Sequence, residues 1–111
     1  MRRIYVCRRY SDDPEGNTRA IREICRDLTA RGYCPIAPQL YLPHFLDEAT
    51  ERTTAMDLCL DLIEVCDEVW VYRTARRPEL SAGQIREVSH AAMFGSKVVY
   101  FDDKTHQLLP L

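Results

Sequence analysis

Short apolar runs alternate along this chain with longer segments in which apolar residues recur every three or four positions. The runs are rich in β-branched and aromatic residues and predict strands at residues 3–7, 34–38, 68–73 and 97–101. The longer segments predict helices at residues 17–31 and 50–66 and between Ser81 and Gly95. Strand and helix therefore alternate throughout, which favours a parallel sheet with helices on both faces.

This pattern predicts an α/β fold, a flavodoxin-like or Rossmann-like three-layer sandwich of four to five strands in the order 2-1-3-4. We expect one domain over residues 1–111, with an apolar tail at 102–111 that packs on a neighbour or frays. In such sheets a ligand crevice lies where the strand order reverses, here between the first and third strands. The loops 8–16 and 74–81 then meet there, with Glu87 beneath them.

The start of the last helix has features beyond those of an ordinary helix end. Ser81 and Gln84 form a capping-box pattern, and Gly95 suits the position after the helix. Gly83, in the first turn, leaves space above Glu87, which lies four residues later on the same face. A small ligand in that space would lie near the positive end of the helix dipole.

Each of these features has a plainer explanation. Ser81 and Gln84 are also explained as a helix cap alone. Glu87 is also compatible with a solvated position beside Arg86 or His90.

Composition narrows the function classes. The net charge is −2 with both signs interspersed, and no apolar run approaches the roughly 20 residues of a membrane span, so we expect neither nucleic-acid nor membrane binding. Five scattered cysteines without a Cys-x-x-Cys pair favour buried reduced thiols and a cytosolic protein. The histidines lack metal-ligand spacing, and neither a Gly-x-Gly-x-x-Gly nor a Walker pattern is present. We therefore predict no metal site and no cofactor.

Several motifs together resemble a known family. They are residues 35–46 (PIAPQLYLPHFL), residues 66–71 (CDEVWV) and the pattern from Ser81 through Gly83 to Glu87. Over about residues 3–101 the chain resembles the nucleoside 2-deoxyribosyltransferase-like superfamily, particularly its short phage and bacterial members. A serine six residues before the glutamate resembles the 2′-deoxynucleoside 5′-monophosphate N-glycosidases.

The resemblance implies a set of roles. Glu87 would be the nucleophile of a retaining displacement on the anomeric carbon, and Tyr5 would reach the sugar. Substrate-binding residues would be Arg8 and Arg9 for a phosphate, Ser81, Gly83 and Gln84 at the helix start, and Tyr41 and His44 with Phe45 as a lid that stacks on the base. The partner would be a small nucleotide or nucleoside, and the assembly a homodimer or larger homo-oligomer.

Alternatives remain for several of these residues. Arg8 and Arg9 are also compatible with surface charges, Tyr5 with the core, and Tyr41 with the core or a subunit interface. Cys59 stands where characterised relatives carry an acid that helps the base leave. A nucleotide-binding sensor, sponge or regulator without chemistry is therefore a second reading, and a structural dimerisation domain is a third.

Overall fold

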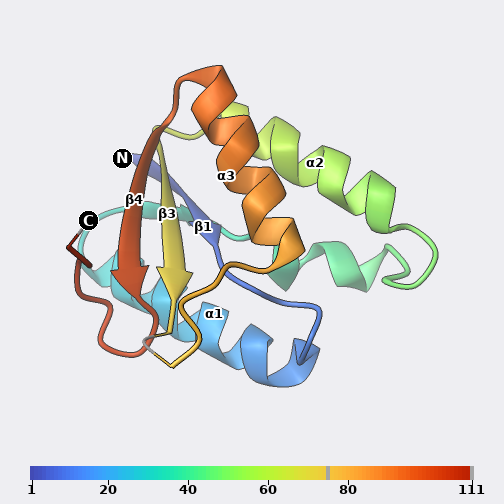
Figure 1. The fold of residues 1–111 in the computed structure, drawn as a ribbon, viewed down its shortest axis with the longest axis horizontal. Helices are drawn as coiled ribbons and strands as arrows, with labels where there is room; N and C mark the ends of the chain where they lie inside the picture. Colours follow the sequence, from blue (N-terminus) through green and yellow to red (C-terminus); the bar gives the residue numbers. More distant parts are fainter. Residues whose placement is uncertain (75, 111) are drawn as a thin grey trace.

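A single parallel sheet organises the chain, with its strands in the order β2-β1-β3-β4. The computed structural model describes residues 1–74 and 76–110. The elements in these residues are β1 (Arg3–Cys7), α1 (Pro14–Ala30), β2 (Cys34–Ile36), the 3-10 helices η1 (Pro38–Leu40) and η2 (Leu42–His44), α2 (Arg52–Glu64), β3 (Glu68–Arg73), α3 (Ala82–Phe94) and β4 (Lys97–Asp102). Figure 1 shows α1 on one face of the sheet and α2 with α3 on the other, so the three layers and the strand order are those predicted.

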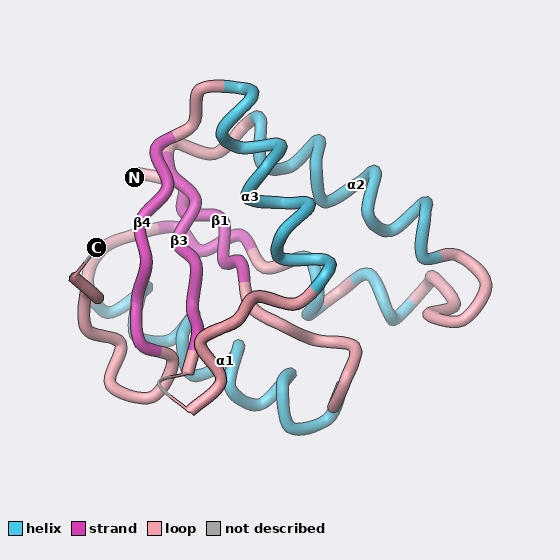
Figure 2. Tube along the Cα trace, in the orientation of Figure 1, coloured by secondary structure: helices cyan, strands magenta, loops and turns pink. Residues whose placement is uncertain are grey.

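Alternation along β1 divides the core into two layers. Ile4 and Val6 pack toward α1, whereas Tyr5 and Cys7 pack toward α2 and α3. All four are buried because β1 is a central strand covered on both faces. Tyr5 and Cys7 therefore face the helix that carries Glu87, and Figure 2 shows the loops after β1 and β3 at the same end of the sheet.

The first helix begins earlier than the sequence predicts. Asp13 is its N-cap and its side chain accepts a hydrogen bond from the Gly16 amide, while Pro14 takes the first helical position. Asn17, at which the sequence predicts the helix to begin, is instead buried in the first turn, where its side-chain amide donates to Asp12 and to the Tyr10 carbonyl. Asn17 therefore holds the loop after β1 rather than the helix end.

The segment between β2 and α2 is more regular than the predicted loop. β2 ends at Ile36, and Pro38 and Pro43 each lie in a short 3-10 helix. Proline fixes φ near the helical value and needs no amide partner there, which suits these short turns. Helix α2 then runs over Arg52–Glu64, two residues shorter at each end than predicted.

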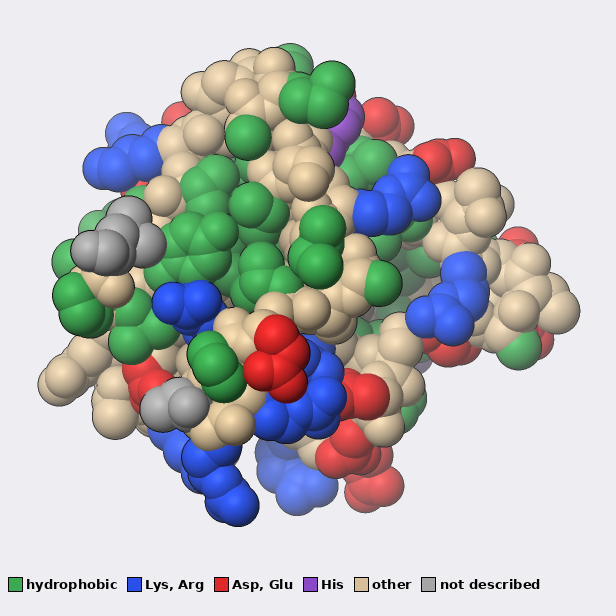
Figure 3. Space-filling view, viewed as in Figure 1, with side chains coloured by type: hydrophobic (Ala, Val, Ile, Leu, Met, Phe, Trp, Pro, Cys, Tyr) green, Lys and Arg blue, Asp and Glu red, His purple; other side chains and the backbone are tan. Residues whose placement is uncertain are grey.

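The C-terminal segment folds back on β4, which is an edge strand of the sheet. The Leu109 amide donates to the Tyr100 carbonyl, and Phe101 forms an isolated antiparallel bridge with Leu108. The segment thus covers the edge of β4 instead of fraying. Figure 3 shows apolar side chains gathered over β4 and α3.

None of the helices in the described residues is both long and apolar enough to span a membrane.

Candidate functional site

A cavity of about 300 Å³ lies where the strand order reverses, beyond the carboxyl ends of β1 and β3. Its volume is at the lower end of the range of small-molecule pockets. The residues that line it are Arg8, Arg9, Tyr10, Ser11, Asp12, Gln39, Leu42, Pro43, Glu48, Arg52, Ala55, Met56, Cys59, Ser81, Ala82, Gly83, Gln84 and Glu87. The cavity therefore lies at the position that the strand order predicts.

Glu87 lines the cavity but is only 4% exposed to solvent. Its two carboxylate oxygens have separate donors from β1: the Tyr5 hydroxyl donates to Oε2, and the Cys7 thiol donates to Oε1 over 3.4 Å. Burial raises the pKa of Glu87 to about 7, and the two hydrogen bonds oppose that rise because they favour the carboxylate. Near neutral pH both the charged and the neutral form of this group are accessible.

The N-terminus of α3 is fixed by side chains as well as by its own backbone. Ser81 Oγ accepts from the Gln84 amide over 3.2 Å, and Gln84 Oε1 accepts from the Ser81 amide over 3.0 Å, which completes the predicted capping box. The Gln84 side chain also donates to the carbonyls of Tyr72 and Cys7, over 3.1 and 3.4 Å. Gln84, 2% exposed, thereby anchors the helix start to β3 and β1.

Gly83 presents no side chain to the cavity at the helix start. A methyl group built on its Cα would lie 3.6 Å from Cε of Met56, across the cavity, with no nearer neighbour among the described residues. As first-turn residues, Ala82 and Gly83 have no carbonyl partner for their amides inside the helix. Both residues line the cavity, so this end of α3 offers two backbone donors beside it.

Arg8 and Arg9 both line the cavity, but their guanidinium groups have different hydrogen-bond partners. Arg8 donates to Asp103 and to Asn17, each over 2.7 Å, and its side chain is 10% exposed. Arg9 pairs with Asp12 over 3.2 Å and donates to the carbonyl of Glu79 over 2.9 Å. Arg8 is therefore part of a buried ion pair, whereas Arg9 lies in a more open network.

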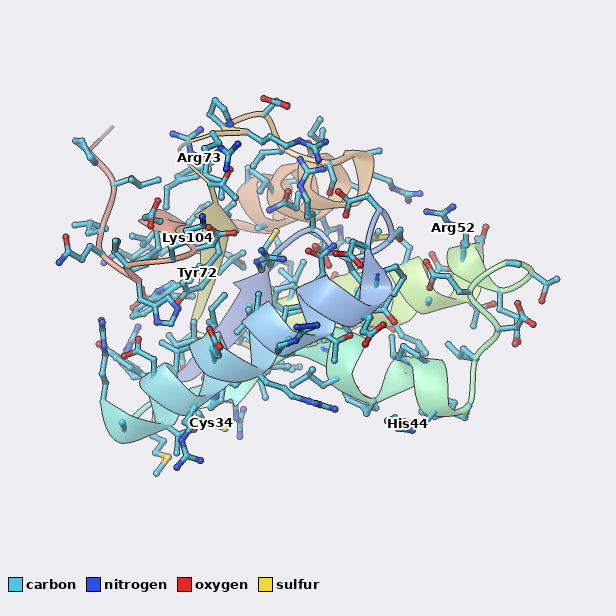
Figure 4. All side chains as sticks on the ribbon, turned by 90° about the horizontal axis from the view of Figure 1, so that it is seen from below. Cys34, His44, Arg52, Tyr72, Arg73 and Lys104 are labelled. Carbon is cyan, nitrogen blue, oxygen red and sulfur yellow. The ribbon has the colours of Figure 1, made fainter. Side chains whose placement is uncertain are left out.

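Tyr41 and His44 are exposed and do not line the cavity. Gln39 of η1 and Leu42 of η2 line the cavity, whereas Tyr41 lies between the two 3-10 helices and faces solvent. Figure 4 shows His44 on the far side of this segment from Arg52. Phe45, the third predicted lid residue, is also exposed and off the cavity, and Leu42 and Pro43 line it instead.

Helix α2 supplies a wall of which the sequence analysis identified only Cys59. Its cavity-facing residues are Arg52, Ala55, Met56 and Cys59. They follow the i, i+3, i+4, i+7 spacing of one helical face, and this is the signal that identifies them. Cys59 is at the buried end of the face and Arg52 is at the exposed end, where its guanidinium is 3.3 Å from Ser11 Oγ.

The described residues contain no group of three or more His, Cys, Asp or Glu side chains that could hold a metal ion. All five cysteines lie within the described residues and are free thiols. What the cavity offers is a buried carboxylate at its floor, backbone and hydroxyl donors at one end of α3, and an apolar wall. This combination suits attack on an electrophilic carbon of a small, partly apolar ligand that carries an anionic group.

Comparisons with known proteins agree with this fold. A family model described as a domain of unknown function, DUF7768, matches residues 2–101. No curated protein matches the chain. Among solved structures, the 2-deoxyribosyltransferase of Leishmania mexicana is similar with a TM-score of 0.70 and 18% identity, over 92% of this chain and 65% of that one. This chain thus spans slightly less than two thirds of that enzyme.

Two further solved structures are similar over most of the chain. The 2-deoxyribosyltransferase of Bacillus psychrosaccharolyticus has a TM-score of 0.64 and 18% identity, over 96% of this chain and 77% of its own. The CMP N-glycosidase of Clostridium botulinum has a TM-score of 0.58 and 17% identity, over 90% and 71%. At such low identity these likenesses establish a shared fold, which confirms the resemblance inferred from the sequence at that level.

Proposed function

Because the chain belongs to the DUF7768 family and shares the fold of 2-deoxyribosyltransferases and a CMP N-glycosidase, we propose that it cleaves the N-glycosidic bond of a (deoxy)nucleoside 5′-monophosphate. The observation that carries this proposal is the Glu87 carboxylate. It lies at the floor of a ligand-sized cavity, with one oxygen held by Tyr5 and the other by Cys7. Such a fixed, desolvated carboxylate is suited to act as a nucleophile.

In the proposed reaction Glu87 attacks C1′ of the sugar, and the electron pair of the C1′–N bond leaves with the base. A glycosyl ester on Glu87 results, and water or a second base then displaces the carboxylate with overall retention. Because Gly83 has no side chain, the sugar would have room above the carboxylate, beside Met56. Tyr5 holds the Glu87 carboxylate in the orientation for attack.

The remaining parts of the substrate match the two ends of the cavity. The 5′-phosphate would accept hydrogen bonds from the Ser81 hydroxyl and from the amides of Ala82 and Gly83, with Arg9 supplying charge. A carboxylate in place of Ser81 would repel the phosphate. The base would pack against the apolar wall of Leu42, Pro43 and Met56. In this arrangement Arg8 and Gln84 position the loops and the helix start through their internal hydrogen bonds.

The test is release of free base from a panel of ribo- and deoxyribonucleoside monophosphates, followed by chromatography. Glu87→Gln and Glu87→Ala should lower release by roughly 10³-fold or more, since no other carboxylate takes the place of the nucleophile. Glu23→Gln, on the exposed side of α1, is the matched control and should release base at the wild-type rate. Full activity of Glu87→Ala would refute the mechanism.

A second candidate function is nucleotide binding without chemistry, and Cys59 is the observation that favours it. Cys59 is the cavity residue of α2 nearest the buried floor, where an acid would assist departure of the base. Thermal unfolding with the same panel separates the two functions, since a ligand at 100 times its dissociation constant stabilises a protein by about 2.7 kcal/mol. Stabilisation without base release identifies a binder, and release identifies an enzyme.

A further inference from the structure

Whether the departing base receives a proton depends on which groups line the cavity. When the C1′–N bond breaks, its electron pair moves onto the base nitrogen. A neutral base leaves as an anion unless a proton arrives, whereas a base with a formal positive charge leaves as a neutral molecule. Proton donation by a positioned acid contributes about 10²–10⁴-fold to such reactions. A cavity without such a donor therefore discriminates strongly between the two classes of base.

On the base side of the cavity, helix α2 contributes two apolar side chains and one thiol. Ala55 and Met56 carry no acidic proton, and Cys59 is the next cavity residue along the same face of α2. Cys59 is 8% exposed, and burial together with the nearby charge of Glu87 raises its pKa to about 12. A thiol in this environment keeps its proton and is a poor donor to a leaving base.

The carboxyl groups that line the cavity do not supply a proton to the leaving base either. Asp12 accepts hydrogen bonds from Asn17, Arg9 and Arg77. These bonds outweigh a desolvation that acts the other way and hold the pKa of Asp12 below its ordinary value, so it stays ionised. Glu87 itself must be ionised to attack C1′.

Among the described residues, the cavity lining has a third carboxyl group, that of Glu48. It is an exposed residue in the segment before α2, and its carboxylate accepts a hydrogen bond from the Ser11 hydroxyl over 2.9 Å. This hydrogen bond holds Glu48 against the loop after β1, at the exposed end of the cavity. Tyr5 and Cys7, beside the floor, already donate their protons to Glu87. Tyr10 also lines the cavity, but it comes from the loop after β1 and packs against the core layer that faces α1.

From this arrangement we infer that the preferred substrates are nucleotides whose base carries a formal positive charge on its ring, such as pyridinium or N7-alkylpurine nucleotides. The inference rests on the proposed function and narrows its substrate class. The carboxylate of Glu87 forms the ester bond to C1′ while the cationic base takes the C1′–N electron pair and departs neutral. Water then attacks C1′, the carboxylate of Glu87 leaves, and the proton of the water passes to solvent.

The experiment measures kcat/KM for base release across 5′-monophosphates that differ in the pKa of the leaving base. The set includes nicotinamide mononucleotide, N7-methylguanosine monophosphate and the unmodified guanosine and cytidine monophosphates. Without a proton donor, kcat/KM should fall steeply as the base becomes a poorer leaving group, by close to the factor seen in the uncatalysed reaction. A shallow dependence in the wild-type protein would overturn the inference.

Variants of cavity residues test whether any of them donates a proton to the leaving base. Cys59→Asp places an acid on the base side and should raise release of unmodified bases by up to about 10²-fold while release of cationic bases changes by less than about threefold. Cys59→Ala and Glu48→Gln should leave the leaving-group dependence as steep as in the wild type. A selective loss of unmodified-base release in either variant would show that the thiol or Glu48 is a proton donor and would overturn the inference.

The outcome is separable from that of the proposed function. Absence of base release from every nucleotide in the set, cationic ones included, would refute the proposed activity and the inference with it. Release that depends on Glu87 but is equally fast for cationic and unmodified bases would keep the activity and refute the substrate class. Far-UV circular dichroism and urea unfolding of Cys59→Asp verify that it is folded, and Cys59→Ala decides the question if it is not.

Discussion

The hydroxyl of Tyr5 on β1 donates a hydrogen bond to Oε2 of Glu87 on α3, 82 positions later in the chain. Tyr5 is fully buried, and the contact exists because β1 is the central strand whose alternate side chains face α3. The bond favours the carboxylate form of Glu87, which burial alone would disfavour. A hydrogen bond from β1 therefore lowers the pKa of Glu87, the nucleophile of the proposed reaction.

Tyr5→Phe should move the titration of Glu87 to higher pH. Removing the hydroxyl removes a donor that lowers the pKa of Glu87, so this pKa should rise above about 7. At pH 7 the ionised fraction and kcat/KM for base release should both fall, and the alkaline plateau should be reached later. The measurement is a pH–rate profile, with NMR titration of the Glu87 carboxyl carbon as an activity-independent readout.

Tyr72→Phe is the matched control for this experiment. Tyr72 is an equally buried strand tyrosine, but it packs in the layer that faces α1. Its removal should leave the titration of Glu87 where it is in the wild type. Equal shifts in the two variants would mean that Tyr5 acts through general packing and not through its hydrogen bond.

Glu87→Gln should change how stability depends on pH. Burial raises the pKa of Glu87 from 4.5 to about 7, so between these values the folded state binds a proton that the unfolded chain releases. The stability that this proton contributes is complete below pH 4.5 and is lost as pH rises through 7. The glutamine variant lacks this loss, so its stability relative to wild type should rise between pH 5 and 8 by up to roughly 3 kcal/mol.

Urea unfolding at several pH values measures this difference. The sign is the decisive observation: a glutamine variant that loses stability relative to wild type as pH rises would mean that the buried carboxylate is stabilising. The Glu23→Gln variant, at an exposed position of α1, is the control for replacing a glutamate outside the cavity.

Much of the fold was predictable because local chemistry and periodicity agree. The bounds of β1 and β3 follow from apolar runs between polar residues, and the start of α3 follows from the capping box at Ser81. The start of α1 was mispredicted because Asp13 and Asn17 are both good caps, and only Pro14 favours the earlier one. Proline-rich residues 38–44 form 3-10 turns whose inward face depends on contacts that no local pattern encodes.

The candidate site was predictable in position more than in detail. Gly83 and Glu87 line the predicted crevice because parallel strands place their loops at one edge. Tyr5 lies beneath it and contacts Glu87, although the roles of all three stay predictions. The sequence does not reveal that Cys7 bonds the carboxylate or that Arg8 pairs with a residue in the C-terminal segment. Both contacts join positions at least 80 residues apart, so only the tertiary fold creates them.

Gly83 gives a prediction that separates stability from binding. Gly83→Ala should stabilise the protein by about 0.5–1 kcal/mol, since alanine favours the helix and its methyl group meets only Met56 at 3.6 Å. Gly83→Leu should instead fill the cavity and abolish the nucleotide-induced shift in melting temperature. Differential scanning calorimetry with and without nucleotide measures both effects. Full nucleotide binding by the leucine variant would place the ligand away from the end of α3.

The buried pair of Arg8 and Asp103 gives a prediction about what holds the site together. Their side chains are 10% and 3% exposed and lie 2.7 Å apart, so Asp103→Asn leaves a buried guanidinium without its counter-charge and should cost about 3–5 kcal/mol in urea unfolding. Arg8→Met should cost a similar amount of stability, because it leaves the buried Asp103 carboxylate without its counter-charge. The double variant Arg8→Met/Asp103→Leu removes both charges and should be more stable than either single variant. If the costs of the two single changes instead add, the pair is not a unit, and Arg8 is free to serve the phosphate as the sequence suggests.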